Sequence, residues 1–272
     1  MSPGEVRPYA EGAPAGKTIM TKVINMVKVK LNDYKQSYQM DEAYKALRTN
    51  LQFCGADKKV IAFTSTTPNE GKSNVTFHLA ASLAESGKSV LLVDADLRKS
   101  VLLGRVQVDQ EVLGLTHYLS KQAKLADVIC ATSLPKFHII FAGIVPPNPA
   151  ELLGSRLFKD MIRTVRDVYD YVIIDTPPVG LVIDGAVIAD SCDGIVIVIE
   201  AGAISYRYVQ ETKAQLEMSS CPILGTILNK VDYAKDGYGK YGKYGRYGKY
   251  GRYGKYGKYG NYGSYGSYGE NN

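Results

Sequence analysis

The chain has 272 residues, of which 45% are hydrophobic and 22% charged, which is enough apolar material for one sizeable core. No apolar run reaches the ~18 residues that a membrane-spanning helix needs, and no signal peptide opens the chain, so the sequence predicts a cytoplasmic protein. The four cysteines lie far apart with no histidine at metal spacing, which argues against a zinc site and predicts free thiols.

The formal net charge of +6 is located in one segment. Residues 237–272 hold seven of the 33 basic side chains and one of the 27 acidic ones, so residues 1–236 are electrically neutral. The same segment holds 11 of the 21 tyrosines and 12 of the 27 glycines. The composition therefore describes a neutral globular body followed by a basic tail rich in tyrosine and glycine.

The N-terminal part of the chain predicts an arm and then a helix. Residues 1–36 contain three prolines and show little periodicity, which predicts a flexible arm that becomes helical near its end. From Met40, the segment MDEAYKALRTNLQF places Ala43, Leu47 and Leu51 four residues apart. This spacing predicts an amphipathic helix with those three side chains on its buried face.

Further along, short apolar runs alternate with stretches of helical spacing. Strands are predicted at Val60–Ser65, Val90–Asp94, His138–Ala142, Tyr171–Asp175, Gly194–Glu200 and Ile223–Asn229. Helices are predicted at Ser73–Ser86, Pro149–Val168, Asp184–Ser191 and Ser205–Met218. Several strands are almost continuously apolar, which is typical of parallel strands buried on both faces. The sequence thus predicts an α/β domain over residues 37–233, with a doubly wound, mostly parallel sheet flanked by helices.

The segment STTPNEGKS, residues 65–73, follows the first apolar strand and opens a helix. Backbone N–H groups in such a turn, at the N-terminus of a helix, bind phosphate oxygens. In this pattern Lys72 binds the β- and γ-phosphates of a nucleotide, and the Ser73 hydroxyl binds Mg²⁺. Thr66 stands where the GxxxxGK[ST] pattern has its first glycine. The predicted cofactor-binding residues of the loop are Thr66, Thr67, Pro68, Asn69, Glu70, Gly71, Lys72 and Ser73.

Three acidic residues end apolar strands. Asp94 and Asp96 follow the second strand and Asp175 ends the fourth. Ligands of an open parallel sheet bind beyond the carboxyl ends of its strands, so these acids are expected to face the phosphate loop. We expect Asp175 to contact a metal through water, and Asp94 or Asp96 to orient or deprotonate an acceptor hydroxyl. The predicted catalytic residues are Lys72, Asp94, Asp96 and Asp175, and the predicted metal ligands are Ser73, Asp94 and Asp175.

The last predicted strand ends in Asn229-Lys-Val-Asp232, which matches the NKxD pattern by which GTP-binding switches read the base. A GTPase would also carry Asp-x-x-Gly after the fourth strand and Gly at position 66, and this chain has neither. Asn229 is therefore predicted to contact the base of the nucleotide. The alternative function is a P-loop ATPase or GTPase switch whose basic tail binds nucleic acid or another polyanion.

From Tyr238 to Tyr268 the chain repeats Tyr-Gly-x eleven times. A period of three with Gly in every repeat prevents a packed core, so residues 234–272 are predicted to be a disordered tail. The tail is interpreted as a kinase substrate, as a nucleic-acid binder through interleaved aromatic and basic residues, or as an inert spacer. The phosphate loop and the acids expected to orient an acceptor hydroxyl favour the first interpretation.

The segments STTPNEGKS, VDADLRK and IIDTPP together resemble the bacterial tyrosine kinase (BY-kinase) family, closest to the cytoplasmic kinases of Gram-positive capsule and exopolysaccharide operons. The resemblance runs from about Met40 to Asp232. It implies a P-loop NTPase fold like that of MinD and ParA proteins, and transfer of phosphate from Mg·ATP to tyrosine in trans. The implied phosphoacceptors are Tyr238, Tyr241, Tyr244, Tyr247, Tyr250, Tyr253, Tyr256, Tyr259, Tyr262, Tyr265 and Tyr268. The dimerising ATPases of the same fold carry an extra lysine where this chain has Thr67.

The same resemblance implies partners. The family's oligomerisation helix carries Glu-x-x-Arg-x-x-Arg, which corresponds here to Glu42, Lys45 and Arg48, so a homo-oligomer, such as a ring, is expected. Lys45 cannot reproduce the forked pairing of the arginine it replaces. A separate transmembrane activator of the polysaccharide co-polymerase type would recruit the kinase to the inner face of the membrane, and a tyrosine phosphatase would reverse its action. No direct nucleic-acid partner is expected. Ser100 stands where relatives often carry Pro, with no obvious consequence.

Overall fold

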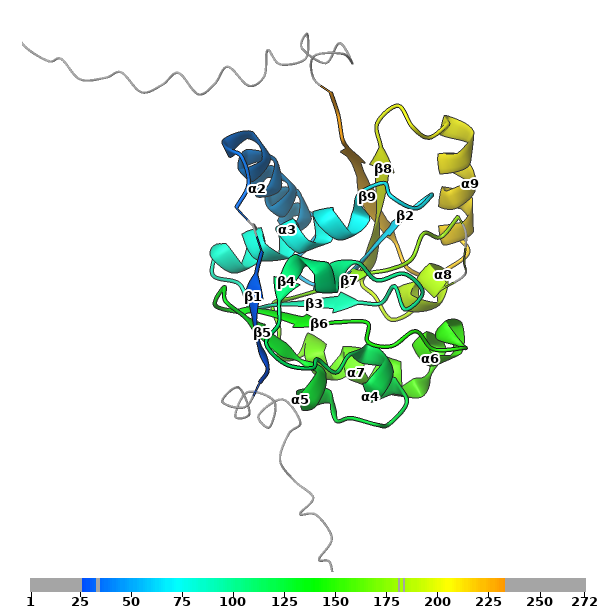
Figure 1. Ribbon diagram of the computed structural model, residues 1–272. Coiled ribbons are helices and arrows are strands. Elements are labelled where there is room, and N and C mark those ends of the chain that lie inside the picture. The colour runs from blue at the N-terminus through cyan, green and yellow to red at the C-terminus, as the bar shows by residue number, and fades with distance from the viewer. Residues whose placement is uncertain (1–25, 33–34, 181, 183, 233–272) are drawn as a thin grey trace, which may run out of the picture. The chain divides into compact units, whose positions relative to one another are not determined.

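The backbone builds one mixed sheet, and the described residues are 26–32, 35–180, 182 and 184–232 of this computed structural model (Figure 1). Over these residues the sheet has nine strands in the order β4-β1-β5-β6-β3-β7-β2-β8-β9. The strands are β1 Lys28–Leu31, β2 Val60–Ser65, β3 Val90–Asp94, β4 Val106–Gln107, β5 Cys130–Thr132, β6 Phe137–Ile140, β7 Tyr171–Asp175, β8 Gly194–Glu200 and β9 Ile223–Asn229.

The six strands from β6 to β9 in this order are parallel, and only β4 and β5 introduce antiparallel pairs. The strand order reverses at β2, which lies between β7 and β8. The predicted doubly wound, mostly parallel sheet is therefore confirmed, and its switch point lies at the strand that leads into the GKS loop.

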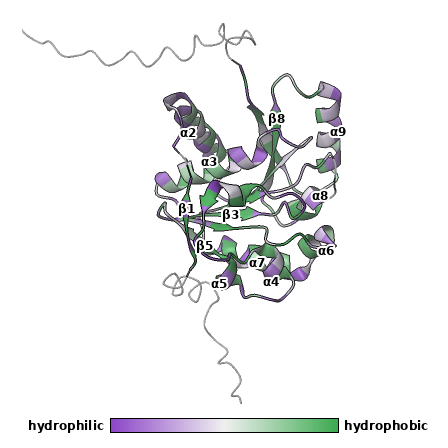
Figure 2. Cartoon of the chain, in the orientation of Figure 1, coloured by the Kyte–Doolittle hydropathy of each residue, from purple (hydrophilic) through white to green (hydrophobic). Residues whose placement is uncertain are grey.

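Helices cover both faces of the sheet because its central strands are apolar on both sides. On one face, α2 (Tyr38–Phe53) packs on α3 (Lys72–Glu85), and side chains of both belong to the same buried cluster. The opposite face carries a second buried cluster, and Figure 2 shows the apolar strands between the two helical layers. The remaining helices are η2 (Leu102–Arg105), α4 (Leu115–Leu119), α5 (Leu125–Val128), α6 (Pro149–Gly154), α7 (Arg156–Arg166), α8 (Asp184–Ala189) and α9 (Tyr206–Leu216).

The expectation of an arm that turns helical over residues 1–36 is wrong for Lys28–Leu31. These residues form β1, which pairs with β4 and β5. Val29 and Leu31 are buried, whereas Lys28 and Lys30 are exposed. This alternation is the period-two signal of a half-buried strand, and the run is so short that its neighbours in the sheet decide its structure.

Two helix predictions also need correction. The segment predicted as one helix over 149–168 is divided into α6 and α7, because Ser155 has an extended backbone and its Oγ accepts the Phe158 N–H at 3.2 Å. The buried face of α2 contains Tyr44 and Leu51 with Leu47 half-buried, while Ala43 is exposed. The larger aromatic side chain replaces alanine on that face because its burial removes more apolar surface from water.

The predicted tail, residues 234–272, lies outside the described residues, and so do its eleven tyrosines. The compact unit to which the sheet belongs ends at Val231.

Asp193 joins the start of β2 to α7. Its carboxylate accepts the N–H groups of Lys59 and Val60 at 2.9 and 2.8 Å and pairs with Arg166. One carboxylate therefore accepts three donors at the amino end of the central strand.

We expect Asp193→Asn to lower the free energy of unfolding by about 1–3 kcal/mol, because the amide removes the charge-assisted bonds and brings N–H donors close to other donors. Urea denaturation followed by circular dichroism measures the change. Asp190→Asn, at an exposed position nearby, is the control and should alter stability by less than about 0.5 kcal/mol. Equal effects of the two substitutions would contradict the role of Asp193 in joining β2 to α7.

Candidate functional site

The loop of residues 65–73 connects β2 to α3 at the carboxyl edge of the sheet (Figure 1). Helix α3 begins at Lys72, preceded by Gly71 in the left-handed conformation with φ 90°. A Cβ atom at Gly71 would lie 2.1 Å from Nδ2 of Asn229, so only glycine fits at this position. The predicted strand–loop–helix arrangement of a phosphate-binding loop is present.

A cleft of about 380 Å³ opens beside this loop. Three segments line it: the phosphate loop, the segment after β3 and the segment after β7. The lining residues are Ser65, Pro68, Asn69, Glu70, Gly71, Lys72, Ser73, Asn74, Asp96, Arg98, Lys99, Val101, Arg105, Pro177, Pro178 and Val182. Of the predicted cofactor-binding residues, Thr66, Thr67 and Asn229 are not among them. The cleft has the position at which ligands bind to open α/β sheets.

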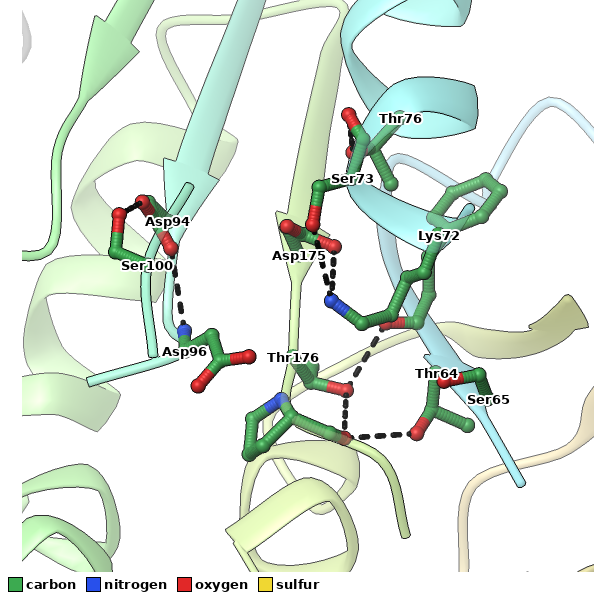
Figure 3. A network of polar contacts seen from close by, with 12 residues as sticks. Thr64, Ser65, Lys72, Ser73, Thr76, Asp94, Asp96, Ser100, Asp175 and Thr176 are labelled. Carbon is green, nitrogen blue, oxygen red and sulfur yellow. Dashed lines mark hydrogen bonds and ion pairs between the residues drawn. The ribbon is translucent and has the colours of Figure 1, made fainter. Parts of the chain in front are cut away.

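Lys72 and Asp175 form a buried ion pair beneath the loop (Figure 3). The Lys72 Nζ lies 2.7 Å from Oδ1 of Asp175 and 3.4 Å from Oγ of Ser73. The two charged side chains are only 7% and 1% exposed. Burial raises the pKa of Asp175, and the Lys72 ammonium opposes that rise. In this conformation the lysine neutralises the carboxylate that ends β7.

Asp94 lies next to Asp175, because β3 and β7 are parallel neighbours and their last residues are in register. Asp94 is fully buried. Burial and the Asp175 carboxylate raise the pKa of Asp94 to about 7, against the lowering effect of a hydrogen bond from the Ser100 hydroxyl. Figure 3 shows Ser100 pointing at Asp94. Ser100 therefore has a structural consequence that the sequence did not reveal.

Asp96 differs from Asp94 in its access to the cleft. It belongs to the cleft lining, whereas Asp94 and Asp175 lie beneath the surface. The N–H of Lys99 donates to Oδ1 of Asp96 at 3.0 Å, and the N–H of Asp96 itself donates to Oδ1 of Asp94 at 3.3 Å. Of the two acids at this strand end, Asp96 is therefore the one that a molecule in the cleft can reach.

Glu70 belongs to the loop, yet it turns its charge away from the phosphate-binding side. Its carboxylate accepts the N–H and hydroxyl of Thr67 and, at 3.1 Å, the N–H of Glu200. The side chain is almost fully buried. These donors hold the carboxylate among N–H groups, which keeps a negative charge from repelling an anion in the cleft.

Asn229 lies behind the loop rather than in the cleft lining. Its Nδ2 donates to the backbone carbonyl of Glu70 at 2.9 Å. The predicted contact with a base stays a prediction, and the second N–H of Nδ2 and the Oδ1 atom are the groups that could meet a ligand.

Arg98 pairs with the buried carboxylate of Asp184 at the start of α8. Its Nε and Nη2 lie 2.7 and 3.0 Å from the two carboxylate oxygens. No sequence signal pointed to Asp184 as the partner of Arg98. This forked pair connects the segment after β3 to the segment after β7.

The residues of the predicted oligomerisation helix point in different directions. Lys45 pairs with Asp41 and Glu42 at 2.8 and 2.9 Å on the exposed face of α2. Arg48 instead donates to the carbonyl of Ser82 on α3 at 2.9 Å. Within one chain, Arg48 thus connects the two helices, while Glu42 and Lys45 stay at the surface.

Over the part of the chain that the structure describes, no group of three or more His, Cys, Asp or Glu side chains could hold a metal ion by itself. Within the same residues, no helix is long and apolar enough to cross a membrane.

Comparison with known proteins assigns the family. Residues 58–218 match the family described as an AAA domain. The tyrosine-protein kinase CpsD of Streptococcus agalactiae is 45% identical over 216 residues, which cover 79% of this chain and 94% of that protein. The kinase domain of the Escherichia coli tyrosine kinase ETK is similar in structure, with a TM-score of 0.67 and 30% identity over 81% of this chain and 95% of that domain.

A more distant structure shows the same fold with a nucleotide. The septum site-determining protein MinD of Pyrococcus horikoshii, solved with Mg-ADP, has a TM-score of 0.56 and 28% identity over 65% of this chain and 72% of that chain. The resemblance to BY-kinases and the fold shared with MinD are both confirmed. With its phosphate loop, its three strand-end carboxylates and these relatives, the chain belongs to the tyrosine-protein kinase family, built on an AAA domain.

Proposed function

We propose that this chain transfers phosphate from Mg·ATP to the tyrosines of its own C-terminal tail, in trans between copies. The observation that supports this most is the Lys72–Asp175 pair at the phosphate loop, with Asp94 in register beside it and Asp96 at the cleft. This arrangement offers what phosphoryl transfer requires, namely a phosphate cradle, a cation for developing negative charge and a carboxylate on the acceptor side.

The donor atoms present fit Mg·ATP. The loop supplies backbone N–H groups at the N-terminus of a long helix, and Ser73 at its first turn supplies a hydroxyl for Mg²⁺. The carboxylates of Asp94 and Asp175 are hard oxygen ligands of the kind that Mg²⁺ prefers. When bound, the metal neutralises negative charge on the phosphates.

The chain's own residues then take separate roles. When a nucleotide binds, Lys72 would leave Asp175 and contact the phosphates. The Asp175 carboxylate would then be available to the metal. Asp96, which a molecule in the cleft can reach, accepts a hydrogen bond from the tyrosine hydroxyl and orients it. Asp94 lies beneath Asp96 and accepts a hydrogen bond from the Ser100 hydroxyl. It is the third carboxylate of the site, with Asp96 and Asp175.

We infer that Asn229 contacts the base of the nucleotide. One N–H of its amide nitrogen donates to the Glu70 carbonyl, which leaves the second N–H as a donor and Oδ1 as an acceptor. Because the amide keeps both kinds of group, it can meet adenine as well as guanine, and the proposal of ATP is supported by the family of the chain.

The tail suits the role of substrate by its composition. Eleven tyrosines follow one another at intervals of three residues, next to seven basic side chains. Each phosphate adds about −1.5 to −2 charges, so four modified tyrosines would offset the basic charge of the tail. We infer that phosphorylation reverses the sign of the tail and so alters self-association and contact with a membrane activator. A tyrosine phosphatase would restore the basic state.

Lys72→Met should lower tail phosphorylation at least ~100-fold, because the loop then lacks the cation that meets the phosphates. The purified protein is incubated with Mg·ATP, and phosphate is mapped by mass spectrometry. Lys88→Met is the control, since this residue lies outside the cleft lining. Phosphate absent from the tail of the wild type, or undiminished in Lys72→Met, would overturn the proposal.

The alternative, a nucleotide switch with a nucleic-acid-binding tail, makes a different prediction. The intact chain would bind DNA or RNA with a strong dependence on salt, and removal of residues 237–272 would abolish that binding. Tail phosphorylation without such binding favours the kinase interpretation.

Asp94→Asn should stabilise the protein in magnesium-free buffer while lowering kinase activity. Burial raises the folded-state pKa to about 7, above the unfolded value of ~3.9, so ionised Asp94 costs stability that grows as pH rises between these values. The gain on substitution should therefore increase by at least about 1 kcal/mol from pH 5 to pH 8. Chemical denaturation at the two pH values measures the gain in stability. A gain independent of pH would contradict the raised pKa of Asp94.

Glu42→Ala combined with Lys45→Ala should reduce the mass measured by light scattering and slow phosphorylation in trans, because both side chains lie on the exposed face of α2. Arg48 is left intact since it connects α2 to α3. The matched control removes another exposed pair, Arg207 and Glu211 on α9. An unchanged mass in the first double variant would count against this face as the interface.

A further inference from the structure

The ends of two neighbouring strands, β8 and β9, hold the phosphate loop from behind. We propose that Lys230, together with Asn229, is a positioning residue that fixes the peptide groups of the loop in their phosphate-binding orientation. The inference rests on the proposed binding of nucleotide at this loop and assigns a role to a lysine that does not line the cleft.

Lys230 connects the loop to β8. Its Nζ donates to the backbone carbonyl of Asn69 at 2.7 Å and to Oε2 of Glu200, also at 2.7 Å. Glu200 ends β8, so the lysine joins that strand end to the loop. The backbone of Lys230 is left-handed, with φ 57°, which is uncommon for a residue other than glycine. Such a backbone is retained where the surrounding contacts require it.

Asn229 makes the parallel contact one peptide further along. Its Nδ2 donates to the carbonyl of Glu70, and its own carbonyl accepts the N–H of Ala201 at 2.9 Å. The N–H of Glu200 donates to the carboxylate of Glu70. The carbonyls of Asn69 and Glu70, which are consecutive in the loop, therefore accept hydrogen bonds from two consecutive side chains. The donors are Lys230 and Asn229, at the end of β9.

The geometry of the peptide bond turns these contacts into a functional constraint. In a trans peptide the carbonyl and the N–H point in opposite directions. The Asn69 carbonyl shares its peptide with the N–H of Glu70, and the Glu70 carbonyl shares its peptide with the N–H of Gly71. When Lys230 and Asn229 fix the carbonyls on the side of β9, the two N–H groups face the other way.

The backbone of the loop agrees with this orientation. Asn69 has φ 68° and Gly71 has φ 90°, so left-handed residues lie on both sides of Glu70. Left-handed residues within such a turn let successive N–H groups converge on one anion. Loss of Lys230 would free the Asn69 carbonyl to rotate, and the loop would then have to be ordered again each time a phosphate binds.

The charge of Lys230 also distinguishes it from a neutral donor. Glu200 balances that charge, so the ammonium is held at the Asn69 carbonyl by a second contact. The lysine side chain is 45% exposed and that of Glu200 29%, which limits the strength of the pair. The expected effect is therefore a weaker affinity for nucleotide rather than unfolding.

The test compares Lys230→Met with Lys230→Arg and with the control Lys213→Met. Lys213 of α9 has a similar exposed pair with Glu217, the residue that follows the helix, and it lies outside the cleft lining. Titration calorimetry with Mg·ADP should show about a 10-fold weaker affinity for Lys230→Met, partial recovery for Lys230→Arg and no change for the control. The KM for ATP should rise more than kcat falls.

Hydrogen exchange of the nucleotide-free protein provides the decisive reading. Amides of residues 66–73 should exchange faster in Lys230→Met, while those of β2 stay unchanged. Unchanged exchange in the loop overturns the proposal, even if affinity falls, because the lysine would then contact phosphate directly. If the wild type fails to bind Mg·ADP, the proposed function fails, and the exchange measurement still tests the positioning role by itself.

Discussion

The buried ion pair between Lys72 and Asp175 is the interaction on which the site depends. Neither charge could remain without the other at this depth, because an unpaired ion in the protein interior costs several kcal/mol. The neighbouring Asp94 receives no such partner, and burial together with Asp175 raises its pKa to about 7. In the nucleotide-free site Lys72 thus pairs with Asp175 beside a second buried carboxylate, that of Asp94, and a bound Mg²⁺ with its phosphates would redistribute those charges.

The parallel sheet makes this concentration of charge possible. Strands β2, β3, β7, β8 and β9 all end at the same edge, and each contributes one group to the loop or the cleft. Asp175 of β7 pairs with Lys72 where the loop enters α3, and the ends of β8 and β9 contact the loop through Glu200, Asn229 and Lys230. Within the loop, N–H donors hold the carboxylate of Glu70 away from the side on which an anion would bind.

Much of this arrangement follows from local sequence. The apolar runs before Ser65, Asp94 and Asp175 predict buried strands, and the GKS segment predicts a helix N-terminus that binds phosphate. Less could be predicted where a short or polar segment depends on distant partners. The strand Lys28–Leu31 forms because β4 and β5 lie beside it. Arg98 pairs with Asp184, which is 86 residues further along the chain.

The sequence by itself determined the fold class and the family, and it predicted the phosphate loop and the acids at the strand ends, because hydrophobic periodicity and motif spacing are local properties of the chain. Only the tertiary structure decided how those residues divide their work. Asp96 reaches the cleft while Asp94 lies beneath it, Lys72 pairs with Asp175, and Asn229 supports the loop from behind. These outcomes depend on burial and on which strand ends are neighbours, and neither quantity is fixed by residues close together in sequence.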